Sequence, residues 1–139
     1  MMIKGVIKKK IISYNDKRGF FREIMKNDNK YTKVKFVQIS HSKIKKSIRK
    51  GWHVHKKQYQ WNYLIKGSIK VSLLDLRKKS KTYMKKMNFS VNEKNPIVYF
   101  FPPHIGHSYI TLKDDNHMIY GTSGTYSKDE EYKLTFKNV

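Results

Sequence analysis

Two histidines near the middle of the chain, His53 and His55, stand two positions apart. Successive side chains of a β-strand point to opposite faces, so this spacing places both imidazoles on one face. A second segment, Pro102 to His107, adds two further histidines beside a rigid turn. Histidine has an ordinary pKa of about 6.5, which suits the removal of a proton next to a ketone near neutral pH. Imidazoles also bind transition metals, so these residues indicate either acid–base chemistry or a metal site.

Alternating apolar and polar residues mark the strands that must position these histidines. Alternation or short β-rich runs occur at residues 35–40, 52–55, 69–73, 97–101, 108–112 and 117–120. Because Gly67-Ser68 separates two such runs, residues 63–65 and 69–73 are predicted to form a hairpin. Only Ser127 to Glu130, which has capping-box spacing, is predicted to start a helix. Many short strands with regular turns predict an all-β sandwich or barrel.

The length and charge narrow the class of protein. A chain of 139 residues predicts one domain, covering residues 1–139. The net charge of +21 favours a nucleic-acid partner at first sight, but 27 of the 31 basic residues are lysines. Proteins that bind nucleic acid favour arginine, whose planar fork pairs bidentately with phosphate and guanine. The sequence also has no zinc-finger spacing or RNA-recognition motif, so we do not expect nucleic acid as a partner.

Several other classes are excluded by what the sequence lacks. Cysteine is absent, which excludes disulfide frameworks, thiolate zinc sites, iron–sulfur clusters and cysteine nucleophiles. The longest apolar run, Ile97 to Phe101, is far shorter than the roughly 20 residues of a membrane-spanning helix. The lysine-rich segment from Met1 to Ile12 contains no apolar stretch of signal-peptide length. We therefore expect a cytoplasmic protein with no membrane segment.

The histidine segments resemble the two motifs of the cupins, which are jelly-roll β-barrels. The first motif matches His53-x-His55, then Gln60 and Gly67, with glutamine at the usual glutamate position. The second motif matches the turn from Pro102 to His107, with His107 at the usual glycine. The resemblance implies a single cupin domain.

Within the cupins, residues 14–132 are most similar to the dTDP-4-dehydrorhamnose 3,5-epimerase family. The similarity rests on Asp16-x-Arg18-Gly19-x-Phe21-x-Glu23, Gln38-x-Ser40-x-Ser42, Gly51-x-His53, Asp75-Leu76-Arg77-x-x-Ser80-x-Thr82, the turn from Pro102 to His107, and Tyr120 with Tyr126. It implies an isomerase that acts on a nucleotide-activated, dTDP-type 4-keto-6-deoxyhexose in deoxysugar or polysaccharide biosynthesis. It also implies that the enzyme needs no cofactor and no metal.

The resemblance further implies roles for single residues. His53 matches the catalytic base, and Tyr120 matches the catalytic acid. Substrate-binding positions fall on Arg18, Phe21, Glu23, Gln38, Arg49, Asn62, His107 and Tyr126. These roles are chemically reasonable, because a tyrosine hydroxyl can protonate an enolate on the face opposite the base, and arginine suits a diphosphate. The family exchanges an N-terminal strand between two subunits, which implies a homodimer.

Alternatives stay open at this point. The segment from Arg49 to Lys56 also resembles the dTDP-4-keto-6-deoxyglucose 3,4-ketoisomerases, in which both histidines act, so His55 is a second catalytic candidate.

The epimerase family orients its base with an aspartate that has no match here. Candidates to replace it are Asp114, Asp115, Glu130 and Glu131. Without such a carboxylate, a non-catalytic cupin that binds a sugar nucleotide or an anionic polymer is the alternative. A metal-dependent cupin would instead use the histidines with Gln60.

Overall fold

The computed structural model describes residues 2–27 and 33–135, which form strands and loops with no helix among them. The strands are β1 (Ile7–Lys10), β2 (Tyr14–Asp16), β3 (Gly19–Phe21), β4 (Gln38–Ile44), β5 (Arg49–His55), β6 (Gln60–Lys66), β7 (Ser68–Asp75), β8 (Lys86–Asn92), β9 (Ile97–Phe101), β10 (Ile105–Thr111), β11 (Asn116–Thr122) and β12 (Glu131–Lys133). The predicted all-β class is confirmed. Within the described part of the chain there is accordingly no helix able to cross a membrane.

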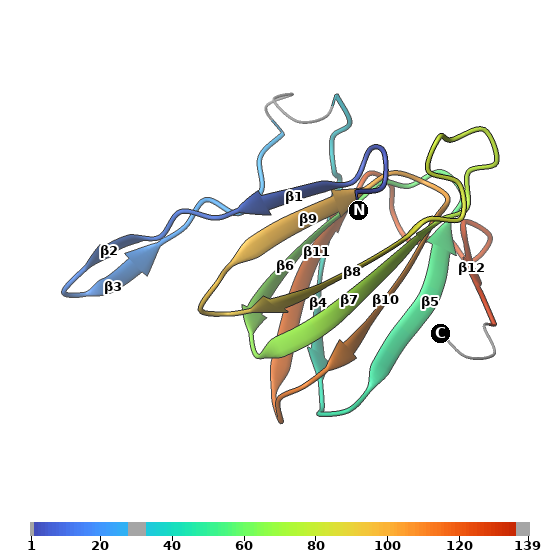
Figure 1. Cartoon of the computed structure of the whole chain (residues 1–139). Helices are drawn as coiled ribbons and strands as arrows, with labels where there is room; N and C mark the ends of the chain where they lie inside the picture. Colours follow the sequence, from blue (N-terminus) through green and yellow to red (C-terminus); the bar gives the residue numbers. More distant parts are fainter. Residues whose placement is uncertain (1, 28–32, 136–139) are drawn as a thin grey trace.

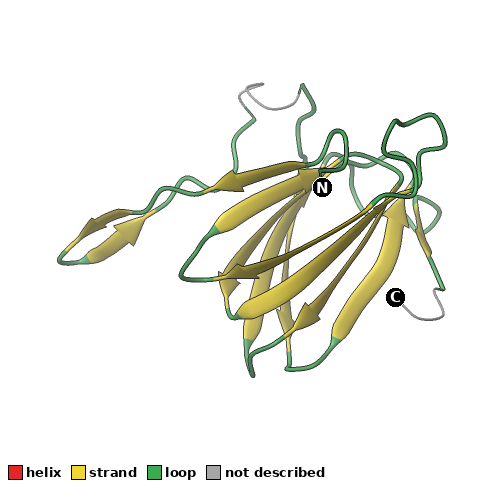
Figure 2. Ribbon diagram, in the orientation of Figure 1, coloured by secondary structure: helices red, strands yellow, loops and turns green. Residues whose placement is uncertain are grey.

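Two antiparallel five-stranded sheets face one another and make up the body of the protein (Figure 1). The first sheet has the order β1-β9-β6-β11-β4, and the second has the order β12-β5-β10-β7-β8. The chain crosses between the sheets repeatedly, which gives the jelly-roll arrangement of a cupin. A third, two-stranded sheet is the hairpin β2–β3, which projects away from both larger sheets (Figure 2).

The main apolar core lies between the two large sheets. Tyr99 and Phe101 of the first sheet pack in one cluster with Val71, Leu73 and Ile105 of the second, all of them buried. Burial of side chains of this size contributes about 1.5–3 kcal/mol each. Strand β9 is buried on its other face too, because Val98 and Phe100 belong to a second cluster that includes residues 24, 25 and 36.

Two local predictions are wrong. Strands β6 and β7 do not form a hairpin, because they belong to different sheets and Gly67 forms the corner between them. Gly67 has a φ of +101°, and a Cβ atom there would collide with the Asn116 amide. The predicted helix start at Ser127 is a turn that leads directly into β12. The Glu130 side chain does not complete a capping box, because it is engaged by residues of the neighbouring strand β5 and the loop that follows it.

Candidate active site

A cavity of about 270 Å³ opens between the two sheets, beside the apolar core. Strands β4, β6 and β11 line it on one side, and strands β5 and β10 line it on the other. The segment from Tyr126 to Glu131, which leads into β12, contributes Tyr126, Ser127, Glu130 and Glu131 to the wall. Most of the lining side chains are polar or titratable, in contrast to the adjacent core.

His53 is bound to a carboxylate from the C-terminal part of the chain. Strand β12 pairs with β5 so that Glu131 lies opposite His55, and its side chain reaches diagonally to His53, two positions along β5. Nδ1 of His53 contacts Oε1 of Glu131, and the His53 side chain is only 27% exposed. The imidazole lowers the pKa of Glu131 below its ordinary value, although partial burial opposes this effect. An ionised carboxylate at Nδ1 keeps the proton on that nitrogen and leaves Nε2 with a lone pair.

His55 has a partner at each ring nitrogen. Nδ1 lies 2.6 Å from Oε2 of Glu130, and Nε2 lies 2.9 Å from Oε1 of Gln60. The other oxygen of Glu130 accepts the backbone N–H groups of Lys57 and Gln58 at 2.9 and 2.8 Å. Burial alone would raise the pKa of Glu130, but these hydrogen bonds outweigh it and hold the pKa below its ordinary value. Glu130 is therefore an ionised carboxylate.

His107 stacks on His55 from strand β10. The two ring centroids are 5.2 Å apart and the ring planes differ by 17°. Burial lowers the pKa of His107 to about 3, and the neighbouring His55 adds to this effect. Because the ring is neutral and Nδ1 lies 3.1 Å from the carbonyl oxygen of Ile105, Nδ1 donates a hydrogen bond.

The remaining predicted residues of the cavity come mostly from the first sheet. Tyr120 on β11 and Asn62 on β6 line the cavity on the side opposite β5. Tyr126 lines the cavity although it is 77% exposed, so it lies at the mouth. Gln38 accepts the backbone N–H of Tyr126 at 3.0 Å. Arg49 does not itself line the cavity, but it donates to Oγ of the lining residue Ser108 at 2.9 Å.

Three predicted substrate-binding residues are not brought to this cavity within the chain. Arg18 lies on the projecting hairpin and binds Asp16 at 2.6 Å. Phe21, on the same hairpin, is 63% exposed. Glu23 follows the hairpin and binds Lys26 at 2.8 Å.

The sequence did not predict which carboxylates reach the histidines. Of the four candidates, Glu130 and Glu131 bind His55 and His53, whereas Asp115 pairs with Lys66 outside the cavity. The only local sequence signal at Glu130 was its capping-box position, which predicts a helix rather than a contact with His55. Gln60 was noted as a possible metal ligand, and its oxygen instead faces His55. In residues 2–27 and 33–135, no group of three or more histidine and carboxylate side chains is arranged to hold a metal ion.

The chain was compared with known proteins. The family model described as dTDP-4-dehydrorhamnose 3,5-epimerase matches residues 1–139. The spore coat polysaccharide biosynthesis protein SpsL of Bacillus subtilis is 34% identical over 130 residues, which cover 93% of this chain and 85% of SpsL. The dTDP-4-dehydrorhamnose 3,5-epimerase of Shigella flexneri is 30% identical over 126 residues, covering 85% of this chain and 69% of that enzyme.

A solved structure agrees with these sequence relatives. The crystal structure of dTDP-4-dehydrorhamnose 3,5-epimerase from Sulfolobus tokodaii superimposes with a TM-score of 0.87 at 29% identity, covering 96% of this chain and 78% of that one. The two-sheet fold, the histidine-lined cavity and the matches along the sequence lead to one assignment. The chain belongs to the dTDP-4-dehydrorhamnose 3,5-epimerase family.

Proposed function

We propose that this protein is an epimerase of a dTDP-linked 4-keto-6-deoxyhexose and works in deoxysugar or polysaccharide biosynthesis in the cytoplasm. The observation that carries the proposal is the contact between Nδ1 of His53 and Glu131, which makes His53 a base facing the cavity. The names of the relatives support the substrate class, because the Shigella flexneri enzyme is named for dTDP-4-dehydrorhamnose and SpsL for a polysaccharide pathway.

The proposed reaction moves one proton off a carbon and another proton onto its opposite face. Nε2 of His53 takes the proton from a carbon next to the ketone, and the C–H electron pair moves to make an enolate with its charge on the carbonyl oxygen. The Tyr120 hydroxyl then donates a proton to the other face of that carbon. His53 and Tyr120 line the cavity from opposite sheets, which suits an inversion. Positioned acid–base groups of this kind contribute about 10²–10⁴-fold in rate.

The mouth of the cavity suits the nucleotide. Tyr126 is exposed there and can stack on the nucleotide base. The Gln38 side chain accepts the backbone N–H of Tyr126. Arg49 and Lys50 lie at the start of β5, where Lys50 lines the cavity, and supply positive charge for the diphosphate. His107 and Asn62 are assigned to the sugar, because both line the cavity and are buried or partly buried.

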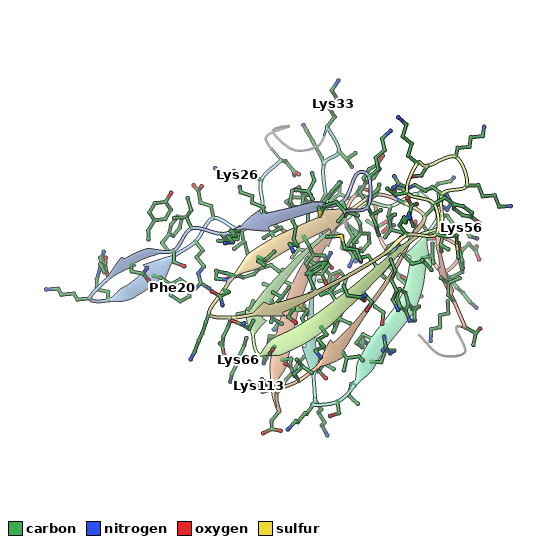
Figure 3. The ribbon with its side chains drawn as sticks, viewed as in Figure 1. Phe20, Lys26, Lys33, Lys56, Lys66 and Lys113 are labelled. Atoms are coloured by element: carbon green, nitrogen blue, oxygen red, sulfur yellow. The ribbon has the colours of Figure 1, made fainter. Side chains whose placement is uncertain are left out.

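We also propose that the chain is one domain that works as a homodimer. Strand β1 pairs with β9 of its own chain, so the N-terminal part that can reach a partner is the hairpin β2–β3. Phe20 and Phe21 on this hairpin are 59% and 63% exposed, and Figure 3 shows Phe20 away from the two large sheets. Exposed aromatic side chains on a projecting element favour a protein interface. In the dimer, Arg18, Phe21 and Glu23 would line the cavity of the other subunit.

The test is proton NMR of dTDP-4-keto-6-deoxyglucose incubated with the protein in deuterated water. Loss of the C3 or C5 proton signal with inversion at that carbon is expected, and it identifies the carbon that is inverted. A 3-keto product would instead establish a ketoisomerase. Binding of the compound without any exchange would contradict the proposal and favour a non-catalytic sugar-nucleotide protein.

The ketoisomerase alternative is less well supported by the geometry. It needs His55 as a second group that exchanges protons, but both nitrogens of that ring are already bound by Glu130 and Gln60. The non-catalytic alternative rests on a missing carboxylate, and Glu131 supplies one to His53.

A further inference from the structure

A chain of hydrogen bonds runs from a backbone carbonyl to His55. The Asn62 amide nitrogen donates to the carbonyl oxygen of Tyr99 at 3.2 Å. The Gln60 amide nitrogen donates to Oδ1 of Asn62 at 2.6 Å. Oε1 of Gln60 then lies 2.9 Å from Nε2 of His55. The three side chains are buried, with exposed fractions of 3% for Asn62 and 7% each for Gln60 and His55.

The backbone carbonyl fixes the direction of every bond in this chain. A carbonyl oxygen only accepts, so the Asn62 nitrogen must face Tyr99 and the Asn62 oxygen must face Gln60. The Gln60 nitrogen must then face Asn62, which leaves the Gln60 oxygen toward His55. Reversing either amide would place two acceptors against each other. Nε2 of His55 is therefore a donor and carries a proton.

The contact at Nδ1, on the opposite side of the His55 ring, also requires a nitrogen that carries a proton. Nδ1 of His55 lies 2.6 Å from Oε2 of Glu130, and this carboxylate also accepts the backbone N–H groups of Lys57 and Gln58. These two backbone N–H groups favour the ionised form of the carboxylate, which can only accept, so Nδ1 must donate to it. With both ring nitrogens donating, His55 carries a positive charge.

This charge lies in the wall of the cavity, where other fixed cations are scarce. Among the described residues that line the cavity, Lys50 is the only lysine or arginine, and its side chain is exposed. His55 is instead buried and held at both nitrogens. A preorganised charge in a site with little water stabilises a developing negative charge more strongly than a mobile one does.

We propose that Glu130 and Gln60 hold His55 as an imidazolium, and that it is a fixed positive charge for the enolate rather than an acid or base. The role in the reaction rests on the proposed epimerase function. His53 and His55 then have different tasks although they share one face of β5. His53 exchanges the proton, and His55 supplies charge without exchanging one.

The charged and titratable groups around His55 agree with this division. Glu130 faces it from the turn before β12, and neutral His107 stacks on it from β10. His53 lies two positions away on the same strand with Glu131 as its partner. Because His107 is neutral, it adds no second positive charge beside His55.

The protonation state can be measured without substrate. Long-range proton–nitrogen NMR of the histidine rings is expected to show both nitrogens of His55 protonated at pH 7. His107 should show a proton on Nδ1 alone in the same spectra. A His55 ring with one unprotonated nitrogen at pH 7 would overturn the proposal. This measurement uses the unmodified protein, so it does not depend on any variant folding or on the identity of the substrate.

The role in catalysis is tested by His55→Gln, which is neutral and of similar length. The rate of C3 or C5 proton exchange at saturating dTDP-4-keto-6-deoxyglucose should fall by on the order of 10²-fold, while the affinity for dTDP stays unchanged. His104→Gln is the matched control, because His104 is exposed in a turn and should exchange at the wild-type rate.

Two results of this second experiment have different meanings. Exchange at the wild-type rate in folded His55→Gln protein would overturn the role of the charge. If the wild-type protein itself binds the compound and exchanges no proton, the proposed epimerase function is wrong and the role at the enolate is overturned with it. The NMR experiment then still decides whether His55 is an imidazolium.

Discussion

Oε1 of Glu131 on strand β12 contacts Nδ1 of His53 on the neighbouring strand β5. The carboxylate follows a short turn near the C-terminal end of the chain, and the histidine lies in the middle of the sequence. Pairing of β12 with the edge of the second sheet is what joins them. The orientation of His53, the base of the proposed reaction, therefore depends on the short strand β12.

Glu131→Gln should reduce kcat by on the order of 10²- to 10⁴-fold. The glutamine nitrogen can donate to Nδ1 of His53, which would place the ring proton on Nε2, where the base needs a lone pair. The affinity for dTDP should change little, since the carboxylate contacts the histidine and not the proposed nucleotide site. Steady-state kinetics of the epimerisation and calorimetry with dTDP measure the two effects separately.

Glu93→Gln is the matched control, because Glu93 is exposed in the turn after β8. It should leave kcat unchanged. If Glu131→Gln keeps the wild-type kcat, then Glu131 does not orient the base.

Local sequence patterns predicted the strands well, because a strand with one buried face alternates apolar and polar residues. Residues 97–101 form β9 as predicted, and residues 117–120 lie within β11. Pairing was harder to predict, since it depends on contacts between distant parts of the chain. The segment around Gly67 has the spacing of a hairpin, but the same spacing also fits a corner between two sheets.

The histidines of the site were predictable and their carboxylates were not. His53 and His55 share a face because of their spacing, and both line the cavity. Glu130 has the position of a capping-box residue, so its local context predicted a helix. Its side chain instead accepts from His55 and from the loop after β5, and no local pattern encodes that long-range contact.

Asp75→Asn should destabilise the folded protein by about 3–5 kcal/mol near neutral pH, because it removes one partner of a buried ion pair. Asp75 is fully buried and accepts hydrogen bonds from Arg77, Ser80 and Thr82. Burial alone would raise the pKa of Asp75, but these hydrogen bonds hold it well below its ordinary value. The free energy of unfolding, measured in urea at several pH values, tests this.

The stabilisation that Asp75 contributes to the folded protein should decrease at low pH. A carboxyl whose pKa is lowered by folding stabilises the protein fully above its unfolded pKa of about 3.9, and this contribution is lost as the pH falls toward the folded value. The difference between wild type and Asp75→Asn should therefore be constant from pH 5 to 7 and shrink below about pH 4. A difference that grows as the pH falls would contradict the ionised state of Asp75. Asp114→Asn, in an exposed turn, is the control.

Gly51→Ala should lower both stability and kcat. Gly51 has a φ of +98°, and a Cβ atom there would lie 2.5 Å from the carbonyl oxygen of His107. Strands β5 and β10 would have to separate beside His53, which we expect to cost about 1–3 kcal/mol and to move the base. Thermal unfolding and kcat measure the two effects.

Gly19→Ala is the control that distinguishes the strain of a positive φ from the collision of an added Cβ atom. Gly19 also has a positive φ, of +140°, but no atom lies within 4 Å of a Cβ atom built there. Backbone strain alone should lower its melting temperature, but by less than the strain and collision together do in Gly51→Ala. Equal losses in the two variants would show that the close approach of β5 and β10 is not what requires glycine at position 51.

Phe20→Ser combined with Phe21→Ser should convert a dimer into a monomer without lowering the melting temperature of the monomeric fold. Both rings are more than half exposed on the projecting hairpin, so the chain's own core does not depend on them. Light scattering and analytical ultracentrifugation measure the mass. Tyr83→Ser is the control, since Tyr83 is an exposed aromatic residue away from the hairpin and should leave the mass unchanged. A double variant that stays dimeric would contradict the interface.

Mixing two inactive variants tests whether the hairpin completes the cavity of the other subunit. Arg18→Ala retains His53 but lacks the hairpin arginine, and His53→Ala retains the arginine but lacks the base. In a mixed dimer, one cavity combines the intact His53 of the first chain with the intact hairpin of the second. Partial recovery of turnover after the two proteins are unfolded and refolded together is therefore expected. No recovery, with mixed dimers confirmed by native mass spectrometry, would mean that Arg18 does not act across the interface.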